Sequence, residues 1–125
     1  MVVDLRATEK HPIHGYVCPD VHGQFEAYRR ELGLTSSSAL LTLLVIREIK
    51  VQRLASSGAR ARDGQPRTAK VSAYIDSSKA QAFKGLIEQL GRSASDCAAD
   101  LVERELEERW LQAVIEAYPA DGGAG

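Results

Sequence analysis

The amino-acid sequence predicts a mainly α-helical protein with a two-stranded antiparallel ribbon, formed by two similar units in one chain. Shifting the 125-residue chain against itself by 58 positions brings Tyr16 onto Tyr74 and Gly33 onto Gly91. Further identical pairs at this shift are Phe25/Phe83, Leu32/Leu90, Ser37/Ser95 and Leu43/Leu101. Each copy, of about 45 residues, is too short for a comfortable core, and a lone strand leaves both edges unpaired. We therefore expect the two units to pair, strand against strand, as a pseudo-dimer.

Each unit opens with a short alternating stretch, at 13–17 and at 71–75, which is typical of a strand with one buried face. A polar break follows, Pro19-Asp20 in the first unit and Asp76-Ser77-Ser78 in the second, and such residues favour helix N-caps. Apolar residues at helical spacing then continue each helix until a glycine, Gly33 or Gly91, ends it.

A second helix is predicted to start almost at once in each unit, with Thr35 or Ser93 as its N-cap. The stretch 40–46 is apolar nearly all round, so it should lie at the centre of the core. In the second unit the apolar stripe runs from Leu101 to Ile115, which predicts one long last helix that ends at Tyr118.

The expected division of the chain follows from these elements. It comprises an N-terminal arm at 1–11, a first unit at 12–54, a basic flexible linker at 55–69, a second unit with an extended last helix at 70–118, and a disordered tail at 119–125. The Gly- and Ser-containing part of this linker, the 12 residues 56–67 at up to ~3.3 Å each, is long enough to return the chain to the opposite strand.

Composition narrows the class of protein. Hydrophobic residues make up 44%, enough for a folded core, and no apolar run reaches the ~18 residues of a membrane span. We expect no secretory signal, because the N-terminus opens with acidic Asp4 and lacks a basic segment followed by an apolar one. Two isolated cysteines, Cys18 and Cys97, are typical of a reducing compartment, so the expected location is cytoplasmic.

The net charge of −1 hides an uneven distribution along the chain. Residues 100–125 contain seven acidic and two basic residues, so they carry −5, and residues 1–99 carry +4. The portion with both predicted strands and the linker is therefore moderately basic, which permits a nucleic-acid partner.

The order strand, polar break, helix, Gly-x-Ser/Thr-x-Ser, helix resembles the ribbon-helix-helix (MetJ/Arc-like) family of DNA-binding proteins. The segment Gly91-Arg92-Ser93-Ala94-Ser95-Asp96 resembles that family's inter-helix turn, and Gly33-Leu34-Thr35-Ser36-Ser37-Ser38 resembles it less closely. Val17 and Ile75 each lie sixteen positions before the turn glycine, as in the family. The resemblance covers residues 12–54 and 70–112, and the fused tandem form is similar to TraY-like relaxosome proteins of conjugative plasmids.

The resemblance implies that the ribbon enters the major groove of double-stranded DNA and that its outward side chains touch base edges. Those side chains are His14, Tyr16, Lys70, Ser72 and Tyr74. It also implies phosphate contacts at the start of each second helix, from Thr35, Ser36, Ser37, Arg92, Ser93, Ala94 and Ser95. Nonspecific phosphate contacts are expected from Arg60, Arg62, Arg67 and Lys79.

The function implied is sequence-specific DNA binding, by a transcriptional repressor or by an accessory factor of plasmid or phage DNA processing. Because the two strands differ in sequence, the DNA site is expected to be asymmetric. The alternative is a protein-interaction adaptor with the same tandem fold, whose surface is the ribbon or the last helix with its acidic segment 103–108 and Trp110. Self-association through the last helix is a further option.

Catalytic and metal chemistry find little support in the sequence. His11, His14, Cys18 and His22 are potential zinc ligands, but their spacing matches no common zinc motif, so no metal or cofactor is expected. The chain has no Gly-rich phosphate loop and no nucleophile elbow, and Cys97 lies among apolar residues where packing explains it. We therefore do not expect an enzyme.

Overall fold

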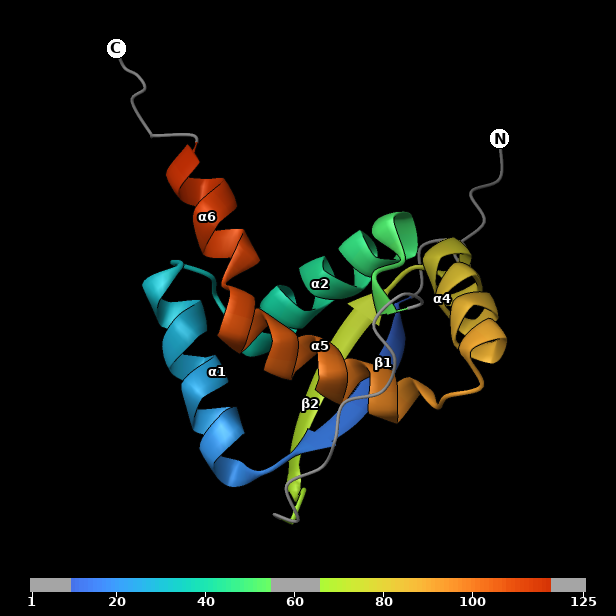
Figure 1. Ribbon diagram of the computed structural model, residues 1–125, viewed down its shortest axis with the longest axis horizontal. Coiled ribbons are helices and arrows are strands. Elements are labelled where there is room, and N and C mark those ends of the chain that lie inside the picture. The colour runs from blue at the N-terminus through green and yellow to red at the C-terminus, as the bar shows by residue number, and fades with distance from the viewer. Residues whose placement is uncertain (1–9, 55–65, 118–125) are drawn as a thin grey trace.

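The computed structural model describes residues 10–54 and 66–117 as two strand–helix–helix units (Figure 1). The first unit consists of β1 (His11–Val17), α1 (Pro19–Glu31) and α2 (Ser37–Val51). The second consists of β2 (Ala69–Ile75), α4 (Ser77–Leu90), α5 (Ala94–Glu108) and a short helix α6 (Trp110–Ala117). Most of the expected arm and linker, and the whole expected tail, lie outside the described residues. No described helix has the length and apolar character needed to span a bilayer.

The predicted ribbon is confirmed: β1 and β2 pair antiparallel along their full lengths. His11 lies opposite Ile75 at one end, Val17 lies opposite Ala69 at the other, and His14 faces Ser72 in the middle. Alternate residues of each strand are buried, and the residues between them face outward, as period-two patterning predicts. The buried positions are Ile13, Gly15, Val17, Val71, Ala73 and Ile75.

The second helix of each unit covers the strand of the other unit. Helix α2 lies along β2, and α5 lies along β1. The Thr42 hydroxyl of α2 accepts a hydrogen bond from the backbone N–H of Tyr74 in β2, at 3.1 Å. In Figure 1, α2 and α5 cross in front of the ribbon, with α1 and α4 on either side. The two units therefore interlock around one core, and neither closes without the other.

The core lies between the inner face of the ribbon and the four main helices. The predicted central segment of α2 is buried through Leu40, Leu41, Leu44 and Val45. The largest fully buried side chains are Tyr28, Phe25, Phe83, Leu40, Leu41, Leu54, Ile75, Val17, Val45, Val102 and Cys97. They come from both units, so burial of apolar surface is what joins the units.

The glycines predicted to end the first helices do so, because both adopt the left-handed conformation that glycine tolerates best, with φ of 78° at Gly33 and 67° at Gly91. Helix α4 begins as predicted, with Asp76 as N-cap accepting from the Lys79 N–H at 2.9 Å. Helix α1 starts earlier than predicted: Cys18 is its N-cap, and Pro19 already lies in its first turn, where its missing N–H costs nothing.

The predicted N-cap of the second helix is correct in one unit and wrong in the other. Ser93 caps α5, but Ser36, not Thr35, caps α2, with its hydroxyl accepting from the Ala39 N–H at 3.1 Å. The turn of the first unit is thus one residue longer, and the repeat shift falls from 58 in the strands to 57 in the second helices. Leu44, and not Leu43, is therefore the counterpart of Leu101, as their burial shows.

The predicted long last helix is also wrong, because it breaks at Arg109. This residue has a left-handed backbone (φ 50°), its N–H closes α5 on the Glu105 carbonyl at 2.7 Å, and α6 leaves in a new direction (Figure 1). Gln52 (φ 55°) ends α2 in the same way. A break at a residue other than glycine or proline has no signal in a hydrophobic stripe.

Candidate nucleic-acid interface

The outer face of the ribbon carries three rows of opposed side chains. Tyr16 faces Lys70, His14 faces Ser72, and Pro12 faces Tyr74. All five residues expected to read bases thus lie on one face, on two strands held in fixed register. Tyr16 and Tyr74 each remain 44% exposed, Lys70 is exposed, and His14 and Ser72 are half-buried.

Pro12 is the member of this face that the sequence reasoning missed. It is exposed and occupies the position of Lys70 at the repeat shift of 58. Period-two alternation from His14 would have found it. Its ring brings no charge and no donor, so the face has a cation at one end and an apolar ring at the other.

The start of α5 lies beside the outer face of the ribbon. Tyr16, Arg67, Ser93, Ser95 and Asp96 line one surface hollow together with Ala99. This hollow therefore brings a predicted base reader, Tyr16, together with three predicted phosphate contacts, Arg67, Ser93 and Ser95. Ala94 lies between the two serines at the first position of α5, where backbone N–H groups have no partner within the helix.

At the start of α2 the acidic neighbour comes from α1 and not from the helix itself. Its first turn contains no acidic residue, and Thr35 is exposed just before the Ser36 cap. A hydrogen bond from the Ser37 hydroxyl holds the pKa of the Glu26 carboxyl on α1 below its usual value, against the opposing effect of burial. The first turn of α5, by contrast, contains Asp96.

The described cations expected to contact phosphate are engaged within the chain. Arg92 donates to Asp96 at 2.8 Å and to Asp100 at 3.0 Å, with its side chain only 10% exposed. Arg67 pairs with Glu103 at 3.1 Å. Lys79 pairs with Asp76, at 2.9 Å. Arg60 and Arg62 lie outside the described residues.

Phosphate contacts from these cations stay a prediction. To bind a phosphate, each cation would have to contact it while still paired with its carboxylate, or give up that ion pair. Lys70 differs from them, because it makes no ion pair with any described residue and projects from the ribbon. The Arg67–Glu103 pair joins residues 36 positions apart, so no local spacing predicts it, whereas Lys79–Asp76 and Arg92–Asp96 lie at helical spacings of three and four.

The histidines and cysteines weighed as zinc ligands do not come together. His11 bonds to the Ser77 hydroxyl at 3.1 Å and His14 to the Ser72 hydroxyl at 2.8 Å, while Cys18 is buried. Within residues 10–54 and 66–117, no three ligand side chains converge on one point. Cys97 is fully buried, and this burial raises the pKa of its thiol to about 11.

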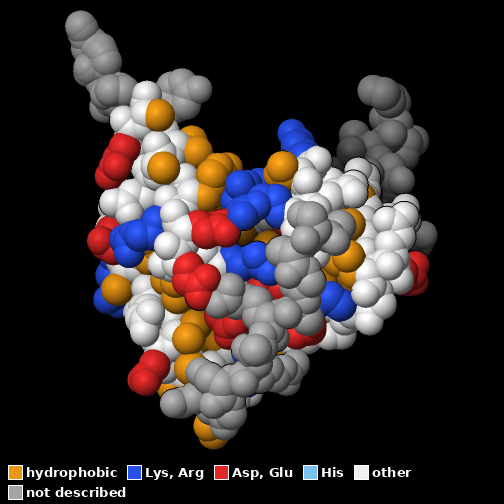
Figure 2. All heavy atoms as spheres, in the orientation of Figure 1, with side chains coloured by type: hydrophobic (Ala, Val, Ile, Leu, Met, Phe, Trp, Pro, Cys, Tyr) orange, Lys and Arg blue, Asp and Glu red, His pale blue; other side chains and the backbone are white. Residues whose placement is uncertain are grey.

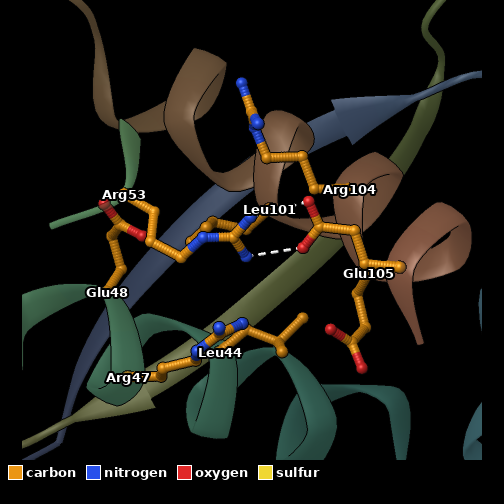
Figure 3. Close-up of a pocket in the computed structure, with 8 residues that line it drawn as sticks. Leu44, Arg47, Glu48, Arg53, Leu101, Arg104 and Glu105 are labelled. Atoms are coloured by element: carbon orange, nitrogen blue, oxygen red, sulfur yellow. Dashed lines mark hydrogen bonds and ion pairs between the residues drawn. The ribbon is translucent and has the colours of Figure 1, made fainter. Parts of the chain in front are cut away.

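The opposite face of the molecule, where α2 crosses α5, holds a charged layer that sequence reasoning also missed. Glu48 and Glu105 are buried there in equivalent positions, with Arg47 and Arg104 as a second equivalent pair around the same small hollow (Figure 3). Arg53 donates to both carboxylate oxygens of Glu108, at 2.5 and 2.7 Å, across the two units.

Positive and negative side chains alternate over this crossing (Figure 2). The layer therefore balances its own charge and joins the two units, and it offers no single-sign surface to a ligand. Its sequence signal is Glu-x5-Leu, Glu48 to Leu54 and Glu105 to Leu111, repeated at a shift of 57.

No family model matches the chain, and neither a curated protein nor a solved structure matches it significantly. The two strand–helix–helix units and their antiparallel strand pairing are consistent with a tandem ribbon-helix-helix-like fold.

Proposed function

We propose that this protein binds double-stranded DNA by placing the outer face of its ribbon in the major groove. The observation that supports the proposal is the outer face itself, where five polar or aromatic side chains stand in register on a two-stranded ribbon. A major groove about 12 Å wide admits a ribbon of this kind. In this proposal the chain acts in the cytoplasm as a binding protein and not as an enzyme.

The chemistry of the face fits base edges. The Lys70 ammonium is a donor for the guanine acceptors O6 and N7, and the hydroxyls of Tyr16 and Tyr74 donate or accept. The N-termini of α2 and α5 add partial positive charge and free N–H groups for the DNA backbone. Without arginine on the ribbon, these contacts predict moderate base discrimination.

The biological role in this proposal is that of a repressor or of an accessory factor in plasmid or phage DNA processing. Both roles require a protein that binds one specific site on DNA. Since Lys70 and Pro12 occupy equivalent positions at opposite ends of the face, the preferred site should be asymmetric. The asymmetry of the site is tested by selecting, from random duplexes, those that the full chain binds. Recovery of perfect palindromes alone would contradict an asymmetric site.

The first experiment is a gel-shift series with fragments of genomic DNA at two salt concentrations. We expect a retarded complex whose affinity falls steeply as salt rises, because phosphate contacts release counterions. If no fragment gives a salt-sensitive shift, the DNA proposal is wrong.

The second experiment tests whether side chains of the ribbon contact the base edges. The double substitution Lys70→Ala/Tyr74→Ala should strongly reduce sequence preference and leave the melting temperature nearly unchanged, because both side chains are exposed. Lys84→Ala removes an exposed cation from α4 and is the matched control, with preference retained. Unchanged binding by the double variant would show that the ribbon is not the reader.

A second candidate function is protein binding through α6. This helix projects from the body of the molecule (Figure 1), and its Ile115 side chain is 44% exposed. Either a protein partner or a second copy of the chain would bury such a side chain. Ile115→Ser should leave DNA binding intact and weaken any association seen by light scattering; if DNA binding is lost instead, α6 belongs to the DNA interface.

A further inference from the structure

The centre of the ribbon coincides with the pseudo-twofold axis that relates the two units. His14 and Ser72 are equivalent at the repeat shift of 58, and they also lie directly opposite each other in the ribbon. A pair of equivalent residues that face each other must have the axis between them. On either side, Ile13 pairs with Ala73 and Gly15 pairs with Val71, which the same axis interchanges.

The two residues on the axis differ, and they are bonded to each other. The Nδ1 atom of His14 lies 2.8 Å from the hydroxyl oxygen of Ser72. This bond draws the imidazole across from β1 towards β2, over the axis. Because a serine hydroxyl can donate or accept, it holds the ring in this position whichever nitrogen carries the proton.

The bond leaves one ring atom for a ligand. Nε2 has no hydrogen-bond partner among the described residues, and His14 belongs to the outer face of the ribbon. In the groove, Nε2 can donate to a guanine or adenine acceptor, or accept from an amino group of adenine or cytosine. Every base pair shows a different pattern when it is turned around, so a single ring with no symmetric counterpart distinguishes the two orientations.

We propose that His14 reads the centre of the DNA site, with Ser72 as the positioning residue that orients its ring, and that this pair gives the central step a direction. The inference rests on the proposed DNA binding and adds to it. In a symmetric dimer the two residues at the axis are identical, so they impose no direction at the centre. Here β1 supplies the imidazole ring of His14, and β2 supplies the Ser72 hydroxyl that holds the ring in place.

The test exchanges the two residues across the axis. The probe is the duplex recovered by the wild-type chain from a random selection, with its central two base pairs replaced by every combination. In the double variant His14→Ser/Ser72→His, the imidazole ring projects from β2, and the serine hydroxyl that orients it projects from β1. We expect the preferred central dinucleotide to become its reverse complement while the flanking preference, set by Lys70 and the tyrosines, keeps its direction.

The single variants separate reading from positioning. His14→Ser should reduce discrimination at the centre by about two- to tenfold, the value of one hydrogen bond. Ser72→Ala should weaken the central preference less, because the ring stays but is no longer held. Melting curves verify that each variant is folded.

The outcomes are distinct from a failure of the proposed function. If the wild-type chain gives no salt-sensitive shift, DNA binding itself is wrong. If the wild type binds and the exchanged variant keeps the original central dinucleotide, or His14→Ser leaves the central discrimination unchanged, the axis pair is not the reader and the inference is overturned.

Discussion

At the scale of single residues, Gly15 shows how closely the two units approach each other. It lies on the buried face of β1, against the start of α5. A Cβ atom at this position would lie 2.9 Å from the backbone oxygen of Ser95 and 2.9 Å from the Cβ of Ala98. The equivalent residue in β2 is Ala73, whose methyl group is accommodated and fully buried. The two halves of the pseudo-dimer therefore differ in how closely the second helix approaches the strand at this position.

Gly15→Ala should lower the free energy of unfolding by about 1–3 kcal/mol, the usual cost of an added group in a packed site. Backbone atoms surround the position, so relief requires α5 to move. Gly85→Ala is the control. Gly85 lies in α4, and apart from its own helix backbone no atom would lie within 4 Å of an added Cβ, so the free energy of unfolding should rise by about 0.5–1 kcal/mol. Urea unfolding measures both changes, and equal effects would mean that α5 and β1 pack more loosely than the structure shows.

At the scale of elements, the ends of the second helices depend on two buried carboxylates. Glu48 accepts a hydrogen bond from the Leu54 N–H at 2.7 Å, and Glu105 accepts from the Leu111 N–H at 2.8 Å. Glu105 also accepts from the Tyr28 hydroxyl at 2.6 Å, and burial together with this bond raises the pKa of Tyr28. The Tyr28 oxygen in turn accepts from the Gln112 N–H at 3.2 Å, so α6 is anchored to the first unit.

Burial raises the pKa of Glu48 in the folded state, so its contribution to stability should fall as pH rises from the unfolded value, about 4.3, through the folded value. Glu48→Gln removes this titration and keeps an oxygen for Leu54. The stability of this variant relative to wild type should therefore increase with pH across that window. Urea unfolding from pH 4 to 7 measures the slope.

Glu108 provides the contrast, since hydrogen bonds from Arg53 lower the pKa of its carboxyl. Its stabilising effect is present above the unfolded pKa and disappears as pH falls through the folded one. Glu108→Gln should thus cost stability at pH 7, by less than about 1 kcal/mol because the pair is partly exposed, and the cost should shrink in acid. Slopes of the same sign in the two variants would contradict this description of the charged layer.

At the scale of the whole molecule, the exchange of second helices makes the fold a property of both units together. Each strand has its hydrogen-bonding partner and its covering helix in the other unit. A chain that closes this way pairs and covers both of its strands within itself, and neither half has a core of its own.

We expect thermal unfolding in one cooperative transition whose midpoint does not change over about a hundredfold range of protein concentration. Calorimetry and circular dichroism measure it, and coincident transitions by both methods would support a single unit. A midpoint that rises with concentration would instead indicate that the ribbon forms between chains.

Much of this fold could be predicted because its signals are local. Alternation sets the strands, residues three and four apart set the helix faces, and glycine at positive φ ends the first helices, so the repeat alone indicates the ribbon and its outward residues. The predictions that failed concern the start of α1, the N-cap of α2 and the end of α5. At the α2 cap a threonine and three serines follow one another, and at the end of α5 Arg109 interrupts a continuous apolar stripe, so the local pattern does not single out the residue.

The sequence by itself therefore determined the two-unit class, the strand pairing and the composition of the outer face, since each follows from contacts between near neighbours or from the need to pair a lone strand. The tertiary structure alone decided that α2 and α5 exchange strands, that Arg67 pairs with Glu103, and that His14 and Ser72 meet on the axis. The physical reason is that most of these contacts join residues far apart in the sequence, and ion pairing and burial depend on which partner the folded chain brings within reach.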